Sequence, residues 1–167
     1  PNLAEAPLAP EARPEGDPIR RWASDFEALR NRSDDFLAEK GNRPLIAMLP
    51  LGPLAKHNIR TGFTSNLLAS GGIAVANPGQ VVPGEVGFEE AVKASPIVVL
   101  CAADSEYETS GQDAVKAARA AGAKEVLVAG SEKSFANAAE DARPDGYLNM
   151  TIDAVAELSR LLNELGA

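Results

Sequence analysis

The sequence predicts an α/β fold, in which a sheet of five parallel strands is covered by helices on both faces. Apolar runs without polar alternation, as at 45–49 and 97–101, are typical of strands buried on both sides. Segments with helical spacing separate these runs, and the Gly71-Gly72 pair stands where a helix is expected to end. Strands that alternate with helices in this way indicate a doubly wound parallel sheet.

The segment before the first strand divides into two parts. Prolines recur through residues 1–18, which favours an extended linker or a strap over a partner. A helix is predicted over 20–40, because apolar residues recur there at helical spacing with charges between them. We therefore divide the chain into a proline-rich linker or strap (1–18), an N-terminal amphipathic helix (19–42) and an α/β domain (43–167). The apolar stripe of the helix consists of Trp22, Phe26, Leu29, Phe36 and Leu37.

The elements of the α/β domain follow from the alternation of apolar runs and helical spacing. Thr151 is the expected N-cap of the last helix. We expect the flavodoxin-like strand order 2-1-3-4-5, in which ligands bind at the carboxyl ends of the strands, so the turn at 50–60 is the first place to look. Strands are predicted at 45–49, 73–75, 97–101, 125–129 and 146–149. One helix is predicted to end at residue 70, and further helices are predicted over 88–94, 106–121, 131–141 and 151–165.

Composition narrows the function classes. The 167 residues carry a net charge of −8 without a basic cluster, which argues against nucleic acid as a partner. No apolar run reaches the roughly 20 residues of a membrane helix, and the start lacks a secretory pattern. The single cysteine, Cys101, is interpreted as a small buried strand residue rather than a reactive thiol. A chain with one cysteine fits a reducing cytoplasm.

The turn after the first strand lacks the residues that three common functions of this fold require. A flavin phosphate needs hydroxyls and amides, but residues 51–55 offer one glycine and no hydroxyl. A phospho-receiver needs an acidic cluster, and no Asp or Glu lies between Glu39 and Glu85. The G-x-G-x-x-G pattern of dinucleotide sites is also absent.

A series of short motifs is spread over roughly residues 22–165. The motifs are Leu51-Gly52-Pro53, Thr61-Gly62-Phe63, Gly71-Gly72-Ile73, Leu100-Cys101-Ala102-Ala103-Asp104 with Tyr107, Ala118-Arg119-Ala120-Ala121-Gly122-Ala123-Lys124, Val128-Ala129-Gly130, Asp145-Gly146-Tyr147 and Asp153-Ala154-Val155. In their order and spacing they resemble the C-terminal domain of the small, non-catalytic subunit of methylmalonyl-CoA mutases. The resemblance implies a cobalamin-binding-type fold and a two-chain isomerase that interconverts methylmalonyl-CoA and succinyl-CoA. It also implies that the large subunit is catalytic and binds adenosylcobalamin.

The same resemblance implies that the cobalamin site of this chain is degenerate. In that family the cobalamin-binding domain of the large subunit carries D-x-H-x-x-G after the first strand. Here His57 stands at the histidine, but Ala55 replaces the aspartate and Arg60 the glycine. Ala102 stands for a serine after the third strand, and Gly130 keeps one of two glycines after the fourth. We assign no catalytic residue, metal ligand or cofactor-binding residue; if cobalamin is held, the expected residues are His57, Ala102, Gly130 and Ser131.

His57, the only histidine, has two interpretations. It is either a cobalt ligand or a polar residue near the start of a surface helix, and the missing carboxylate favours the second. Arg60 would also crowd the space that the family's glycine leaves open, while Lys56 and Arg60 could instead meet an anion or an acidic partner. The acids Asp104, Glu106 and Glu108 are interpreted as a solvated helix start.

We therefore expect a structural and assembly role beside the catalytic large subunit, with no catalysis by this chain alone and no nucleic acid or membrane partner. Adenosylcobalamin is expected in the partner subunit. One alternative is a free-standing cobalamin-binding module that uses His57. The other is an interaction domain unrelated to cobalamin, with the charged segment 1–40 as its docking arm.

Overall fold

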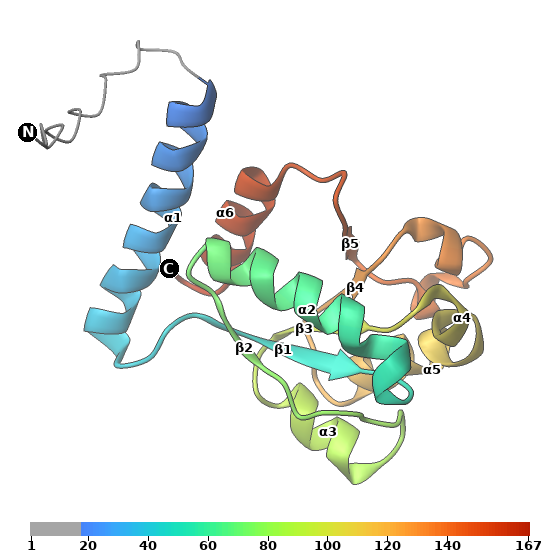
Figure 1. Cartoon of the computed structure of the whole chain (residues 1–167). Helices are drawn as coiled ribbons and strands as arrows, with labels where there is room; N and C mark the ends of the chain where they lie inside the picture. Colours follow the sequence, from blue (N-terminus) through green and yellow to red (C-terminus); the bar gives the residue numbers. More distant parts are fainter. Residues whose placement is uncertain (1–17) are drawn as a thin grey trace, which may run out of the picture.

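The computed structural model describes residues 18–167, and within them five strands form one parallel sheet in the order β2-β1-β3-β4-β5 (Figure 1). The predicted fold class and strand order are confirmed. The predicted linker or strap at 1–18 lies almost wholly outside the described residues, since Pro18 already belongs to the first helix. The strands are β1 (Leu45–Pro50), β2 (Ala74–Ala76), β3 (Ile97–Cys101), β4 (Glu125–Ala129) and β5 (Gly146–Leu148).

The central strands are buried because both of their faces are apolar. Every residue of β3 is buried, and β3 pairs with β1 on one side and with β4 on the other. Successive residues of a strand point to opposite faces, so Val98 and Leu100 contribute to one core while Val99 and Cys101 contribute to the other. The predicted interpretation of Cys101 as a buried strand residue is confirmed.

Helices cover both faces of the sheet, and a different set of helices packs on each face. Leu29 of α1 (Pro18–Lys40), Leu68 of α2 (Leu54–Ser70) and Leu158 of α6 (Ala154–Glu164) share one core with the sheet. Phe88 of α3 (Val86–Val92) and Val115 of α5 (Gln112–Ala120) belong to the core on the opposite face. This arrangement leaves the carboxyl edge of the sheet framed by the first turns of α2 and the segments that follow β3, β4 and β5.

Helix α1 is fastened to the domain by polar contacts as well as by its apolar stripe. The Arg32 guanidinium donates to Ser159 Oγ at 2.9 Å and to Asn163 Oδ1 at 2.6 Å, both on α6. Ser33 is fully buried and donates to the carbonyl of Gly72 at 2.6 Å. These contacts place the second half of α1 firmly beside α6 and the end of α2.

The helix predicted over 106–121 is present as an uninterrupted helical run from 104 to 120, which contains a π-helical turn. A short turn α4 (Asp104–Glu106) leads into a π-helical turn η1 (Tyr107–Gly111), and α5 follows. A π turn accommodates an extra residue, and such turns often mark sites where a side chain must be redirected. Here Tyr107 is buried under the sheet edge, and a Cβ at Gly111 would lie 2.8 Å from Phe135 Cζ.

The prediction of a helix over 131–141 is wrong. The segment forms two 3-10 turns, η2 (Glu132–Phe135) and η3 (Glu140–Ala142). The backbone bonds of this segment are of the i→i+3 type, since the Ala138 N–H donates to the carbonyl of Phe135 at 3.0 Å and the Ala142 N–H to that of Ala139 at 3.0 Å. Two arginines bind carbonyls near its end. Arg143 donates to the carbonyl of Ala138 at 3.1 Å, and Arg119 donates to that of Asp141 at 3.0 Å.

The N-cap expected at Thr151 is also wrong. Asp153 caps α6, because its Oδ1 accepts from the backbone N–H of Ala156 at 3.1 Å. Thr151 instead donates its hydroxyl to Asn149 Oδ1 at 2.6 Å. The helix consequently begins later than predicted.

Two absences concern the described part of the chain. None of the helices between residues 18 and 167 has the length and apolar character that crossing a bilayer requires. Nor do these residues bring together a group of three or more His, Cys, Asp or Glu side chains able to hold a metal ion.

Candidate functional site at the carboxyl edge of the sheet

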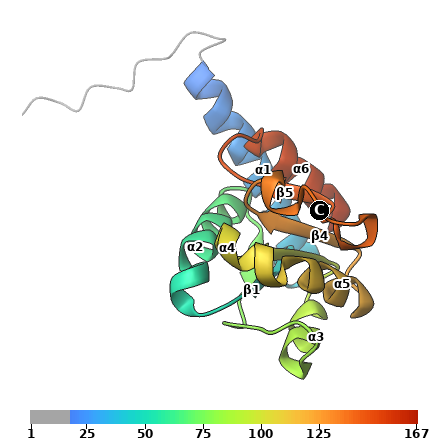
Figure 2. The ribbon, with the colours of Figure 1, turned by 90° about the vertical axis from the view of Figure 1, so that its right-hand side faces the viewer.

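The residues that sequence reasoning singled out lie along the carboxyl edge of the sheet, which Figure 2 faces. His57 and Arg60 come from the first turns of α2, directly after β1. Ala102 follows β3, and Gly130 follows β4. Because all strands are parallel, their ends meet at this edge, where ligands of doubly wound sheets bind.

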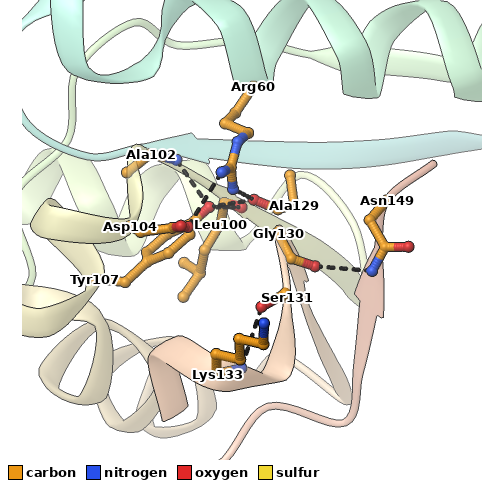
Figure 3. A network of polar contacts seen from close by, with 10 residues as sticks. All are labelled: Arg60, Leu100, Ala102, Asp104, Tyr107, Ala129, Gly130, Ser131, Lys133 and Asn149. Carbon is orange, nitrogen blue, oxygen red and sulfur yellow. Dashed lines mark hydrogen bonds and ion pairs between the residues drawn. The ribbon is translucent and has the colours of Figure 1, made fainter. Parts of the chain in front are cut away.

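Arg60 reaches from α2 across the sheet edge to the end of β4. Its Nη1 donates to the carbonyl of Ala129, and its Nη2 pairs with Asp104 Oδ1 at 3.1 Å (Figure 3). The side chain is only 27% exposed, so the guanidinium occupies space at the edge rather than pointing into solvent. Asp104 is 61% exposed at the start of α4, as expected of a solvated helix start, and it also pairs with Arg60.

Gly130 lies directly beneath that guanidinium. A Cβ built on Gly130 would collide with Arg60 Nη1. The backbone there is held from the neighbouring strand, since the Gly130 N–H donates to the carbonyl of Leu148 at 3.0 Å and its carbonyl accepts from Asn149 Nδ2 at 3.1 Å (Figure 3). The glycine thus makes room for an internal arginine.

Tyr107 closes the edge from the opposite side. Its hydroxyl accepts from the Ala102 N–H at 2.8 Å and lies within hydrogen-bonding distance of two carbonyls, Leu100 at 3.0 Å and Ala129 at 2.8 Å. Burial raises the pKa of Tyr107 well above its ordinary value, so the phenol stays protonated. Sequence reasoning noted Tyr107 only as part of a motif, and no sequence signal indicates this role because the contacts join the ends of two separate strands, β3 and β4.

His57 is buried, which corrects the expectation of a polar residue on a surface helix. It is 6% exposed, and its Nδ1 lies 3.0 Å from the carbonyl of Gly52. Gly52 adopts a φ of 74°, a conformation that favours glycine, and a Cβ there would lie 2.9 Å from Glu106 Cδ. Glu106 thus covers the turn after β1, a contact that the interpretation as a solvated helix start did not include, because its partner is a glycine without a side chain.

The remaining predicted residues are engaged in the fold. Ala102 is fully buried. Ser131 caps η2 by accepting from the Lys133 N–H at 3.2 Å. Lys56 donates to Ser105 Oγ at 3.3 Å, and Arg60 is paired internally, so the two cations do not form an open anion site together. The structure therefore brings Arg60, Ala102 and Gly130 together around Tyr107, and places His57 at the neighbouring turn.

A hollow of about 320 Å³ remains beside Arg60. The surface of the hollow is mainly apolar. Two of its lining side chains are largely exposed to solvent, Ile59 at 79% and Met150 at 92%. The hollow is lined by Ile59, Arg60, Phe63, Asp104, Gly130, Ser131, Leu148, Asn149 and Met150.

Cys101 contributes no reactivity to this edge. Its Sγ lies 3.5 Å from Thr64 Oγ1, and burial raises the thiol pKa to about 12. A thiol with this pKa is almost entirely protonated at neutral pH, so it is a poor nucleophile. The residue packs under the sheet edge and takes no part in the site.

The residues at this edge do not fit cobalamin. The imidazole of His57 is buried, and Ala55 supplies no carboxylate to orient it. Arg60 fills the space above Gly130 that a ligand would need, and Ala102 offers no hydroxyl. Every one of the four residues named for that case is either apolar or already engaged in the fold.

The chain is similar along its whole length to part of several known proteins. No family model matches it. It is 51% identical over 171 residues to a protein of Mycobacterium tuberculosis named "Probable methylmalonyl-CoA mutase small subunit", with 100% of this chain and 27% of that protein covered. The chain is 34% identical over 171 residues to the methylmalonyl-CoA mutase small subunit of Streptomyces virginiae, and the match covers 99% of this chain and 27% of that protein.

A third relative extends the comparison to another genus. The methylmalonyl-CoA mutase small subunit of Propionibacterium freudenreichii subsp. shermanii is 34% identical over 146 residues, which is 84% of this chain and 22% of that protein. The chain therefore spans about a quarter of the length of the relatives that it matches.

Proposed function

We propose that this chain, which is homologous along its whole length to part of the methylmalonyl-CoA mutase small subunits, is the C-terminal domain of such a subunit. Its role is structural, in assembly with the catalytic large subunit, and its cobalamin site is degenerate. The assembled isomerase interconverts methylmalonyl-CoA and succinyl-CoA, and its adenosylcobalamin is bound by the large subunit.

One observation carries the proposal of a degenerate site: the Arg60 guanidinium spans the sheet edge. It binds the Ala129 carbonyl and Asp104, and it covers Gly130. Displacing it would break a charge-assisted hydrogen bond and leave a partly buried cation without its partners. A ligand that binds in the space above Gly130 would have to displace the guanidinium, and the free energy of that displacement would weaken its binding.

The proposal of a non-catalytic role rests on the state of the groups at the edge. The Tyr107 hydroxyl is committed to backbone groups, His57 faces a backbone carbonyl, and the Cys101 thiol is protonated. General acid–base or nucleophilic work needs a group that can reach a substrate with a pKa near the working pH. These three groups lack that access.

Two experiments test the proposal. The first is a titration of this chain and of the full-length small subunit with hydroxocobalamin, followed by visible absorption, with the large subunit as the positive control. We expect no saturable spectral shift from the small subunit. A saturable shift that disappears in His57→Ala would overturn the degenerate site and support the cobalamin-binding module instead.

The second experiment is co-purification of the tagged full-length small subunit with the large subunit. We expect a stable complex that has isomerase activity only when both chains are present. Failure to form the complex would support the alternative of an interaction domain unrelated to cobalamin enzymes. The two experiments address different parts of the proposal, so either can fail while the other holds.

A further inference from the structure

The hollow beside Arg60 is the part of the sheet edge that the guanidinium leaves open. Its volume of about 320 Å³ lies at the small end of the range for ligand pockets, roughly 300–1,000 Å³. Ile59 and Phe63 contribute apolar surface from α2, while Leu148 and Met150 contribute it from the end of β5 and the residues after it. A small apolar group therefore finds contacts here without displacing Arg60.

The polar side chains that line the hollow have hydrogen-bond donors to spare. A guanidinium carries five N–H bonds, and the described bonds of Arg60 use one on Nη1 and one on Nη2. Ser131 Oγ accepts from the Lys133 N–H, and its own hydroxyl hydrogen has no acceptor among residues 18–167. Asn149 Nδ2 uses one of its two hydrogens on the carbonyl of Gly130. Figure 3 shows Arg60, Ser131 and Asn149 reaching this edge from three separate segments.

Acceptors at the hollow are largely occupied. Asn149 Oδ1 already accepts from the Thr151 N–H at 2.9 Å and from the Thr151 hydroxyl at 2.6 Å. Asp104 gives one oxygen to Arg60, and its side chain is 61% exposed, so water reaches the other oxygen. The hollow thus presents more free donors than acceptors, and the opposite charges of Arg60 and Asp104 offset each other.

We propose that the hollow binds a small molecule that combines an apolar body with a carbonyl or carboxylate oxygen. The body packs against the apolar side chains, and the oxygen accepts from Arg60, Ser131 or Asn149. Its location fits this role, because ligands of doubly wound sheets bind at the carboxyl ends of the strands. The inference goes beyond the proposed function, which assigns this chain a structural role, and does not depend on it.

Saturation-transfer difference NMR on the full-length small subunit tests the proposal, since the method detects weak binding to large proteins. The probes are 3-phenylpropionate and 3-phenylpropylamine, which share an apolar body but end in a carboxylate and an ammonium group. We expect saturable binding of 3-phenylpropionate, with a Kd at least about tenfold below that of the amine, because donors bind a carboxylate oxygen and cannot bind an ammonium group. The net charge of −8 favours the amine at long range, so this preference would report the local donors.

A matched pair of variants locates the binding. Ile59 lines the hollow and is 79% exposed, so Ile59→Ser removes apolar contact surface without opening the core. Leu54 is 69% exposed on the same helix and lies outside the hollow, which makes Leu54→Ser the control. We expect Ile59→Ser to raise the Kd for 3-phenylpropionate at least about threefold and Leu54→Ser to leave it unchanged. Met150→Ser, at a side chain that is 92% exposed, should repeat the effect of Ile59→Ser.

Three outcomes would overturn the proposal. No saturable signal from 3-phenylpropionate up to about 10 mM would mean that the hollow is not a ligand site. Binding of the amine as tight as that of the carboxylate would mean that the free donors do not select the ligand. Equal loss in Ile59→Ser and Leu54→Ser would place the binding elsewhere. The proposed function is judged separately, by the cobalamin titration and by co-purification.

Discussion

At the scale of single residues, side chains cover the carboxyl edge of the sheet and bind the backbone groups at the strand ends. Tyr107 satisfies backbone groups at the ends of β3 and β4, and Arg60 satisfies the carbonyl of Ala129 from the other side. The crowding by Arg60 was expected from its position in the family's motif, whereas the role of Tyr107 does not follow from residue type or spacing, because it depends on strands that are distant in the sequence. Burial of His57 was missed for the same reason.

Removing the Tyr107 hydroxyl is predicted to destabilise the protein. Tyr107→Phe leaves the buried Ala102 N–H without its acceptor, so the free energy of unfolding should fall by about 1–3 kcal/mol. Urea denaturation followed by circular dichroism measures the change. Tyr147→Phe is the matched control, since that ring is only partly buried, and it should stay within about 0.5 kcal/mol. Equal stability of Tyr107→Phe and the wild type would contradict the proposed role of the hydroxyl.

The raised pKa of Cys101 predicts a loss of stability at alkaline pH. The thiol pKa is about 12 in the folded protein and 9.0 in its ordinary state, so the unfolded chain releases this proton first. The contribution is fully present below pH 9 and is lost as the pH rises toward 12, with a slope of up to about 1.4 kcal/mol per pH unit. Unfolding measured between these pH values should show a shallower decline in Cys101→Ala than in the wild type. Parallel declines in the two proteins would contradict the prediction.

At the scale of elements, the boundaries depend on which polar groups find partners. The sequence pattern placed the start of the last helix near Thr151, but the chain uses Asp153, whose carboxylate reaches the Ala156 N–H. The segment after β4 has the composition of a helix, yet it folds into two 3-10 turns with i→i+3 backbone bonds. The choice among such local partners is not visible in a propensity pattern.

The capping role of Asp153 can be measured directly. Asp153→Ala removes the acceptor at the start of α6 and should lower the free energy of unfolding by about 1 kcal/mol. Thr151→Ala removes only an exposed hydroxyl bond to Asn149 and should have a smaller effect. Thermal unfolding of both variants decides between the two caps. A larger loss in Thr151→Ala would restore the cap predicted from the sequence.

At the scale of the whole molecule, the alternation of apolar runs and helical spacing was sufficient to predict the layers and the strand order. The strands at 45–49, 97–101 and 125–129 were found because both of their faces are apolar. The residues singled out from the sequence lie at the edge where these strands end, because parallel strands bring their carboxyl ends together. The occupation of this edge by Arg60 agrees with the expectation that Arg60 crowds the space left open by the family's glycine. The contacts of Tyr107 could not be predicted, since they depend on groups that meet only in the folded chain.

Because Arg60 occupies the sheet edge, its removal together with a carboxylate at position 55 is predicted to restore cobalamin binding. In the double variant Ala55→Asp with Arg60→Gly, the guanidinium is gone and a carboxylate stands where the family signature has one. We expect this variant to give a saturable absorption shift with hydroxocobalamin at concentrations where the wild type gives none. Arg60→Gly alone serves as the control and should respond more weakly, because His57 still lacks an orienting carboxylate. No response from the double variant would mean that the loss involves more than these two positions.

The unbroken course of α1 has a mechanical consequence. The helix runs from Pro18 to Lys40 without a kink-forming residue between them, so it spans roughly 35 Å at 1.5 Å per residue. Its second half is clamped to α6 by Arg32. A torque applied at Trp22 is therefore transmitted to the sheet as a rotation of the whole domain. The helix therefore acts as a rigid lever on the domain rather than as a hinge.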